Sequence, residues 1–257
     1  MEGPSLFLAA EQLQPFVDNK VLRVEGNTTI GKERLKSEIV KEIFSWGKHL
    51  IFQFDNFALK VHFLLYGSFE ALVKGVQVTG DYKRTKAPRL FLAFRNGEIR
   101  MFNCSVKFIE DSHFRNSYDF RTDIMSREWD SMLALTKLKA FPKEEIGDVL
   151  LDQDIFAGVG NIIKNEILFL TRTNPKRKTG SITIKKRREI IEEARTFSLL
   201  FYQWRKIFQL KKHLVIYRKS TCPLCATKII REKTGKRQRW SFYCPKHQPL
   251  LRPKKKV

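Results

Sequence analysis

The spacing of three cysteines and one histidine near the end of the chain limits the possible folds more than any other feature. Two residues separate Cys222 from Cys225, two separate Cys244 from His247, and eighteen residues lie between the pairs. This spacing is typical of two metal-binding knuckles joined by a hairpin, and three thiolates with one imidazole form a tetrahedral zinc site. Four protein ligands leave no open position for a water, so we expect one structural Zn²⁺ in a zinc ribbon.

The stretch "KTGKRQRW" lies between the two knuckles. Thr234 and Gly235 predict a turn there, because glycine readily adopts the backbone conformations of tight turns. We expect Arg237 and Arg239 to point outward from a rigid ribbon. A guanidinium in such a place suits contact with a phosphate, so the ribbon is a candidate nucleic-acid interface.

The distribution of charge also favours a polyanionic partner. The chain has 257 residues and a formal net charge of +22. Residues 171–257 contain 26 Lys and Arg against 4 Asp and Glu, whereas residues 1–170 contain 23 of each. A basic excess confined to one region is typical of proteins that bind nucleic acid. No amphipathic helix with a clean apolar face accompanies the charge, so a membrane surface is disfavoured.

The first part of the chain has the alternating pattern of strands. Apolar and polar residues alternate in "LIFQFDNFALKVHF" around Asp55 and Asn56, and in "RLFLAFRNGEIRMFNCSVKFI" around Asn96 and Gly97. Both segments predict hairpins, and Asn-Gly is a strong turn signal. We therefore expect strands over most of 21–109, with a helix over "LFLAAEQLQPFV" before them.

Beyond residue 121 the apolar spacing becomes helical. We expect four helices, within "SREWDSMLALTKLKAF", "PKEEIGDVLLDQDIF", "AGVGNIIKNEILFL" and "TIKKRREIIEEARTFSLLFYQW". The two glycines of the third segment predict a tight turn that leads into its helix. The chain is therefore expected to be α+β, with a second core in its helical part.

Several segments occur together in one order: Glu2-Gly3-Pro4, Gly47-Lys48 before a hairpin, "DQDIFAGVGNIIKNEILF", and a zinc ribbon ending in "QRWSFYC". This ordered set resembles the formamidopyrimidine-DNA glycosylase/endonuclease VIII family over essentially the whole chain. The resemblance implies an N-terminal β-sandwich with flanking helices, a helix-two-turns-helix domain and a C-terminal zinc ribbon. We place the catalytic sandwich at 1–120, the helical domain at 121–216, the ribbon at 217–250 and a basic tail at 251–257.

The resemblance also implies base-excision repair, in which the enzyme flips a damaged nucleotide out of the stack and attacks its sugar with an amine. In that family the amine is the chain's own N-terminus, here Met1, beside the catalytic acid Glu2. An α-amine titrates near 7.8 and a lysine near 10.4, so the terminus is the readier nucleophile at neutral pH. Lys48, which stays charged, is expected to hold a phosphate or to help the base leave.

The opening departs from the family pattern Met-Pro-Glu-Gly-Pro. Met1 takes the place of the proline nucleophile, so the amine is primary, and methionine before a bulky Glu2 resists removal. Two alternatives follow. Either Met1 is a working nucleophile, or the protein keeps only base removal or binding of damaged DNA. A zinc-ribbon RNA-binding protein is a third possibility that no sequence feature demands.

The expected substrate follows from a second departure. Little room exists before Cys222 for the lid that the purine-specific branch closes over 8-oxoguanine, and "MFNCSVKFIED" is closer to the endonuclease VIII pattern. Oxidised pyrimidines and abasic sites are therefore favoured, in double- or single-stranded damaged DNA. Leu65 and Tyr66, beside Leu64, are the candidate wedge that fills the emptied stack.

Further expectations concern phosphate binding and cellular location. Asn161 at the start of a helix is expected to bring backbone N–H groups and its amide to a phosphate, and Gly160 before it permits the close approach of that phosphate. We expect a monomer without a membrane partner, located in the cytoplasm or nucleoid, or in the nucleus of a eukaryote, and not secreted. His49, His62 and His113 are expected to have ordinary structural roles.

Overall fold

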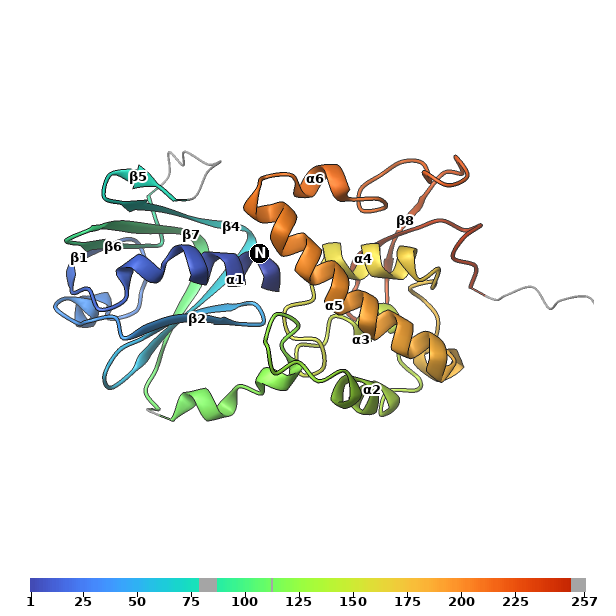
Figure 1. The fold of residues 1–257 in the computed structure, drawn as a ribbon, viewed down its shortest axis with the longest axis horizontal. Helices are drawn as coiled ribbons and strands as arrows, with labels where there is room; N and C mark the ends of the chain where they lie inside the picture. The colour runs from blue at the N-terminus through green and yellow to red at the C-terminus, as the bar shows by residue number, and fades with distance from the viewer. Residues whose placement is uncertain (79–86, 112, 251–257) are drawn as a thin grey trace, which may run out of the picture. The chain divides into compact units, whose positions relative to one another are not determined.

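The structure is a computed structural model that describes residues 1–78, 87–111 and 113–250. It divides into two compact units, Met1–Asp119 and Phe120–Val257 (Figure 1). The basic tail expected at 251–257 lies outside the described residues. Among the described residues, no helix combines the length and the apolar character needed to cross a membrane.

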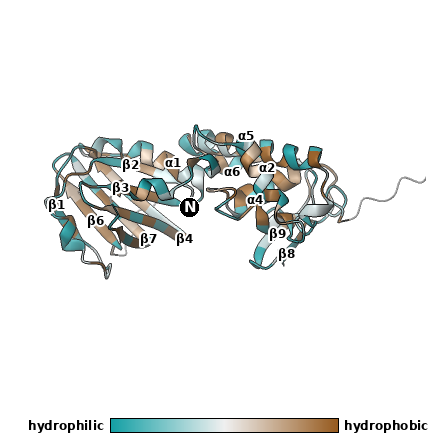
Figure 2. Cartoon of the chain, turned by 90° about the horizontal axis from the view of Figure 1, so that it is seen from below, coloured by the Kyte–Doolittle hydropathy of each residue, from teal (hydrophilic) through white to brown (hydrophobic). Residues whose placement is uncertain are grey.

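The first unit is built on one antiparallel sheet. Its strands are β1 (Val21–Glu25), β2 (Glu42–Trp46), β3 (His49–Gln53), β4 (Ala58–Val73), β5 (Val76–Gln77), β6 (Leu90–Phe94) and β7 (Gly97–Ile109). The order across the sheet is β1-β6-β7-β4-β3-β2, and β5 pairs with β4. The apolar residues of these strands, brown in Figure 2, supply most of the core of this unit.

The expected mixed α+β class with an N-terminal sheet is confirmed. The strands that were expected to form a β-sandwich are joined by hydrogen bonds into one continuous sheet. The reason is the length of β4 and β7, which have 16 and 13 residues. Their pairing shifts register between Phe63 and Ser68. An irregularity of this kind bends a strand and raises its twist, so the same two strands can serve both halves of the sheet.

Both predicted hairpins are present, one of them with its turn displaced. In the first, Gln53 of β3 pairs with Ala58 of β4. In the second, Phe94 pairs with Gly97, so the loop contains the two residues before Gly97. A Cβ on Gly97 would lie 1.8 Å from the carbonyl oxygen of Leu72 on β4. Gly97 is therefore required by the close approach of two strands.

One helix covers part of the first unit. Helix α1 (Gly3–Gln12) begins earlier than expected because Pro4 is accepted in its first turn, and it is followed by the 3-10 turn η1 (Gln14–Phe16). The buried side chains of Leu6 and Ala9 belong to the core. Gln14 Nε2 donates to the carbonyl oxygen of Ile43 at 2.8 Å, which fixes the end of the helix to β2.

The second unit is helical. Its helices are α2 (Ser131–Lys139), α3 (Ile146–Val149), α4 (Asn161–Leu170), α5 (Ile184–Lys206) and α6 (Leu210–His213). Asp130 caps α2 by accepting the N–H groups of Met132 and Leu133, and the Thr183 side chain caps α5. The second expected helix is reduced to the four residues of α3, followed by turns. The remaining three expected helices are present.

The ribbon follows α6 in the same unit. Strands β8 (Ile230–Thr234) and β9 (Arg239–Tyr243) form a two-stranded antiparallel sheet. A small apolar cluster that includes Ile216, Ile229 and Phe242 surrounds the cysteines Cys222 and Cys244. Shorter 3-10 turns complete the chain at η2 (Lys32–Leu35), η3 (Phe114–Ser117), η4 (Phe120–Thr122) and η5 (Thr179–Ser181).

Candidate active site and metal centre

The fold brings the predicted metal ligands together. One ligand atom each from Cys222, Cys225 and His247 lies within 4.8 Å of the others. The sulfur of Cys244 lies 3.7 Å from that of Cys225, which adds the fourth donor. His247 Nε2 is buried and has no hydrogen-bond partner among the described residues, as expected for an atom that coordinates a metal. The Thr227 hydroxyl beside Cys225 lowers the pKa of its thiol to about 6, which favours the ligating thiolate.

Helix α4 holds the ribbon through three consecutive side chains. Lys164 Nζ donates to the carbonyl oxygen of Trp240 at 3.1 Å and to Ser241 Oγ at 2.8 Å. Asn165 Oδ1 accepts the N–H of Phe242 at 2.7 Å. These buried contacts connect one face of α4 to β9.

Glu166 is the third of these side chains, and it is fully buried. Its carboxylate accepts the backbone N–H groups of Val215, Ile216 and Tyr217 at 2.8 to 3.1 Å. Burial raises the pKa of Glu166, although the three hydrogen bonds oppose that effect. Glu166 therefore fixes the segment that leads into the ribbon.

Acidic residues of the helical part hold the turn between β8 and β9. Asp148 Oδ2 accepts the N–H of Lys236 at 2.5 Å. The Arg237 guanidinium, which was expected to point freely outward, pairs with Asp152 at 3.3 Å. Arg239 is exposed and has no ion-pair partner among the described residues. The two arginines of the predicted phosphate contact therefore have different surroundings.

The glycine-rich turn leads directly into α4. Gly160 precedes the helix, and Asn161 is its first residue. The side chain of Gln153 supports the turn, because its Oε1 accepts the N–H of Gly158 at 3.0 Å. Asn161 Oδ1 is buried and has no hydrogen-bond partner among the described residues. The turn thus presents a helix N-terminus in the predicted place.

The N-terminus is attached to the core of the first unit. Met1 is partly buried and packs against that core. The Glu2 carbonyl oxygen accepts the N–H groups of Ser5 and Leu6 at 2.9 and 3.2 Å, so the residue is the N-cap of α1. The terminal amine is therefore held at the start of a rigid helix.

Lys48 and His62 share the electrostatic surroundings of this amine. Lys48 and Gly47, which has a φ of 54°, form the two-residue turn between β2 and β3. The pKa of His62 is lowered first by burial, and then by the terminal amine, Lys48 and Lys60. A neutral imidazole therefore lies in an electropositive region that includes the predicted nucleophile.

An aromatic cluster adjoins His62, and no sequence pattern predicts it. His49 contacts the rings of Trp46, His62 and Tyr118 at centroid distances of 6.0, 5.6 and 6.4 Å. Burial and nearby cations lower the pKa of His49 to about 4. His49 and His62 come from neighbouring strands, so their meeting depends on the pairing of β3 with β4.

The candidate wedge lies at the irregularity of β4. Leu64, Leu65 and Tyr66 are 45%, 68% and 69% exposed, so they form an apolar projection on the surface. Tyr66 has a φ of 64°, and Asn103 Nδ2 donates to the carbonyl oxygen of Leu65 at 2.5 Å. A Cβ on Gly67 would lie 2.6 Å from the carbonyl oxygen of Asn103. Local backbone geometry therefore fixes the projection.

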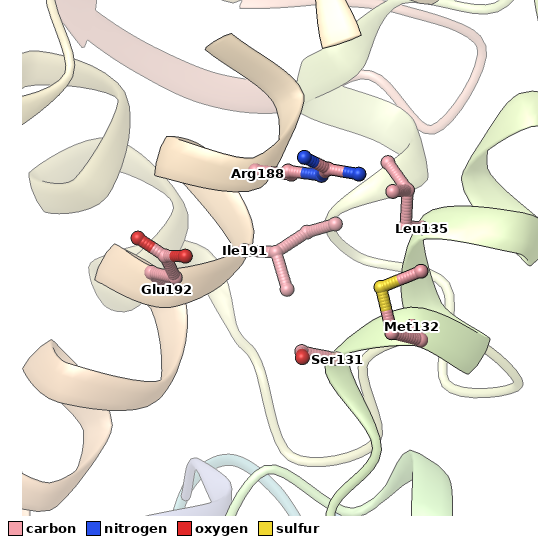
Figure 3. A pocket seen from close by; sticks show the side chains of 6 residues that line it. All are labelled: Ser131, Met132, Leu135, Arg188, Ile191 and Glu192. Atoms are coloured by element: carbon pink, nitrogen blue, oxygen red, sulfur yellow. The ribbon is translucent and has the colours of Figure 1, made fainter. Parts of the chain in front are cut away.

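A small pocket lies between α2 and α5 and has a volume of about 60 Å³. Figure 3 shows its lining side chains, which are Ser131, Met132, Leu135, Arg188, Ile191 and Glu192. None of the predicted site residues lines this pocket. Its size and partly apolar walls leave no place for a flipped nucleotide.

Known proteins resemble the chain in both sequence and fold. The family model of the formamidopyrimidine-DNA glycosylase H2TH domain matches residues 122–197. Human endonuclease 8-like 3 is 31% identical over 248 residues, which cover 95% of this chain and 40% of that protein. The chain belongs to the formamidopyrimidine-DNA glycosylase/endonuclease VIII family. It lies nearer the endonuclease VIII branch, as the sequence predicted.

Two further relatives extend this comparison. The DNA-(apurinic or apyrimidinic site) lyase Nei2 of Mycolicibacterium smegmatis is 23% identical and covers 95% of this chain and 97% of its own length. Lactococcus lactis formamidopyrimidine-DNA glycosylase, solved with DNA that contains an abasic site, superposes with a TM-score of 0.81 at 20% identity. That alignment covers 97% of this chain and all of the other, so the two proteins share a fold. The chain spans less than half the length of its human relative.

The predicted site residues fall in both units. The first unit contains Met1, Glu2, Lys48, Leu65 and Tyr66. The second contains the glycine-rich turn, the two arginines of the ribbon and the four metal donors.

Proposed function

We propose that the chain is a base-excision-repair DNA glycosylase that removes oxidised bases, with pyrimidines favoured, and that it cleaves abasic sites through a Schiff base. The observation that carries this proposal is the arrangement at the N-terminus. An amine fixed at the start of α1 shares an electropositive region with Lys48 and a neutral His62. Membership of the family and the relative named as an abasic-site lyase support the same chemistry.

The proposed reaction begins with the unprotonated amine of Met1. Its nitrogen forms a bond to C1′ of the flipped nucleotide while the bond from C1′ to the base breaks, and the base leaves with a proton. The sugar ring then opens as its oxygen takes a proton, and the nitrogen is left as an iminium ion at C1′. The Glu2 carboxylate is the proposed group that moves these protons.

Strand cleavage follows from the iminium ion. Loss of a proton from C2′ places an electron pair next to the iminium, and the bond from C3′ to its phosphate oxygen breaks. Lys48, as a cation, is the proposed partner of the phosphate charge. Gly160, Asn161, Arg239 and Arg237 are proposed to hold the backbone of the DNA, and Leu65 and Tyr66 to fill the emptied stack.

The ribbon is proposed to hold one structural Zn²⁺ through Cys222, Cys225, Cys244 and His247. The donor set and the unpartnered His247 Nε2 support zinc over harder cations. A bound zinc would fix the ribbon that carries Arg239 and take no part in the reaction. With DNA as the proposed substrate, we propose a location in the cytoplasm or nucleoid, or in the nucleus of a eukaryote.

Trapping with borohydride tests the proposed reaction. Borohydride reduces a Schiff base to a stable amine, so the wild type should form a covalent adduct with abasic-site DNA. Glu2→Gln should reduce the rate of adduct formation by roughly 100-fold, in the range expected for loss of an acid–base group. Mass spectrometry of a proteolysed adduct should place the sugar on the Met1 amine.

A second candidate function follows from the replacement of proline by Met1. A protein that binds damaged DNA without cleaving it would show no adduct and would keep its preference for abasic-site DNA over undamaged DNA. An adduct on a lysine instead of the N-terminus would contradict the assigned nucleophile. Lengthening the N-terminus by two residues should abolish the adduct if Met1 is the nucleophile.

A further inference from the structure

One face of the ribbon hairpin carries an exposed aromatic side chain that the proposed reaction does not use. Trp240 is 41% exposed, whereas Phe242, two residues further along the same face of β9, is buried against Tyr217. Side chains alternate between the two faces of a strand, so Trp240 and Arg239 point to opposite faces of β9. Trp240 therefore lies on a face separate from that of Arg239.

Two cations accompany the indole ring on this face. The Arg231 guanidinium carbon lies 4.4 Å from the ring centroid of Trp240, and Lys233 Nζ lies 5.7 Å from it. Lys233 is the direct cross-strand partner of Trp240. These distances are within the range of cation–π contacts, so the three side chains form one surface.

The two cations lack carboxylate partners among the described residues. Two other cations near the ribbon are neutralised, because Lys176 pairs with Glu232 and Lys236 pairs with Glu144 at 2.7 and 2.6 Å. Glu232, which lies between Arg231 and Lys233 in sequence, points to the opposite face. The charges of Arg231 and Lys233 are therefore not neutralised by a carboxylate of the described residues, so the surface around Trp240 can attract an external anion.

The backbone of Trp240 is fixed from behind. Its carbonyl oxygen accepts hydrogen bonds from Lys164 Nζ at 3.1 Å and from Asn165 Nδ2 at 3.3 Å. The ring is thus attached to a rigid support, which lowers the entropy lost when a ligand stacks on it.

We propose that Trp240, Arg231 and Lys233 form an accessory site that stacks one unpaired nucleobase of single-stranded DNA and binds its flanking phosphates. An aromatic ring beside cations is the usual arrangement for binding a single strand, because every base offers a face for stacking. Bases inside a duplex are already stacked, so a blunt duplex cannot use the ring. The choice of DNA as the nucleic acid rests on the proposed function.

The test compares binding of two undamaged DNA molecules by wild type, Trp240→Ala and Trp240→Phe. Fluorescence anisotropy would measure the affinity for a thymidine oligomer of about 15 nucleotides and for a blunt-ended duplex of two complementary strands, which has no unpaired loop. Trp240→Ala should weaken binding of the oligomer roughly tenfold, within the range for loss of one stacked base. Binding of the blunt duplex should change less than about twofold, and Trp240→Phe should keep most of the affinity for the oligomer.

A loss below about twofold for the oligomer, or an equal loss for both DNA molecules, would overturn the proposal. Zinc content of each variant checks that the ribbon is intact. Should Trp240→Ala lose zinc, the wild type and Trp240→Phe alone decide the matter. The oligomer should then quench tryptophan fluorescence more in the wild type, and equal quenching would overturn the proposal.

Borohydride trapping of the wild type on a blunt abasic duplex tests the proposed function separately, because its failure leaves the comparison on undamaged DNA unchanged.

Discussion

The imidazole rings of His49 and His62 meet edge to face, with centroids 5.6 Å apart and planes at 66°. Burial lowers the pKa of both rings, and the cations Lys48 and Lys60 strengthen the effect. The charge of the terminal amine also lowers the pKa of His62. Both imidazole rings are therefore neutral at neutral pH, and they add no positive charge to the proposed catalytic region.

The free energy of unfolding should depend on pH through His49. Its pKa is about 4 in the folded protein and near 6.5 when unfolded, so only the unfolded chain binds the proton between these values. Stability should therefore fall as the pH falls from 6.5 to 4, by roughly 3 kcal/mol at most, and change little from this source below pH 4. Urea denaturation of wild type and His49→Phe at several pH values measures this dependence.

His113→Gln is the matched control, because the His113 side chain is 83% exposed. It should keep the pH dependence of the wild type, whereas His49→Phe should weaken it and leave the share of His62, whose pKa is lowered in the same direction. A His49→Phe protein that loses stability with acid as steeply as the wild type would show that His49 is not the group responsible.

Zinc removal should disorder the ribbon. The wild type should contain about one zinc per chain, and Cys222→Ser should contain almost none, because three donors bind zinc much more weakly than four. Mass spectrometry for metals measures the content, and limited proteolysis should show new cleavage beyond residue 215. Cys104→Ala is the control, since Cys104 is buried in the core of the first unit. Full zinc content in Cys222→Ser would remove Cys222 from the ligand set.

The metal ligands could be predicted from sequence because their chemistry leaves a signature in spacing. Two pairs, each with two intervening residues, are typical of metal-binding knuckles, and the structure brings all four donors together. The role of Gly97 could not be predicted in the same way. Its closeness to Leu72 depends on the pairing of β7 with β4, and the local sequence contains only a turn signal.

Glu166 should contribute more to stability than any exposed acid of the helical unit. In Glu166→Gln an amide N–H group replaces one accepting oxygen and faces a backbone N–H. Leaving a buried donor unsatisfied costs about 1–3 kcal/mol, so urea denaturation should show a loss of that size. Glu192→Gln, on the exposed side of α5, should change stability by less than about 0.5 kcal/mol. Equal stabilities of the two variants would show that the three hydrogen bonds to Glu166 contribute little.

Arg239 and Arg237 should differ in their effects on DNA binding. Arg239 has no carboxylate partner among the described residues, whereas Arg237 is paired with Asp152. Loss of one phosphate contact lowers the slope of log affinity against log salt by about 0.9. Arg239→Ala should show this change on abasic-site duplex, and Arg237→Ala should show a smaller one. A larger change for Arg237→Ala would mean that the arginine leaves Asp152 to bind DNA.

The difference between these arginines also shows a limit of prediction from sequence. The two lie close together in a basic turn, and the pattern treats them alike. The acid that distinguishes them, Asp152, lies 85 residues away from Arg237 in the chain. The same limit applies to His49 and His62, which were expected to have ordinary roles because neither has ligand spacing.

The projection at Leu65 and Tyr66 should serve lesion processing and contribute little to folding. Leu65 is 68% exposed, so Leu65→Ala should change the free energy of unfolding by less than about 0.5 kcal/mol. If the side chain fills the space left by a flipped base, the variant should remove an oxidised pyrimidine from duplex DNA more slowly, because unstacking costs a few kcal/mol that the wedge offsets. The rate on single-stranded DNA should change less, since no duplex has to be opened. Val76→Ala, at a position 67% exposed on β5, is the matched control. Equal slowing of Leu65→Ala on both substrates would show that Leu65 acts in some step other than opening the duplex.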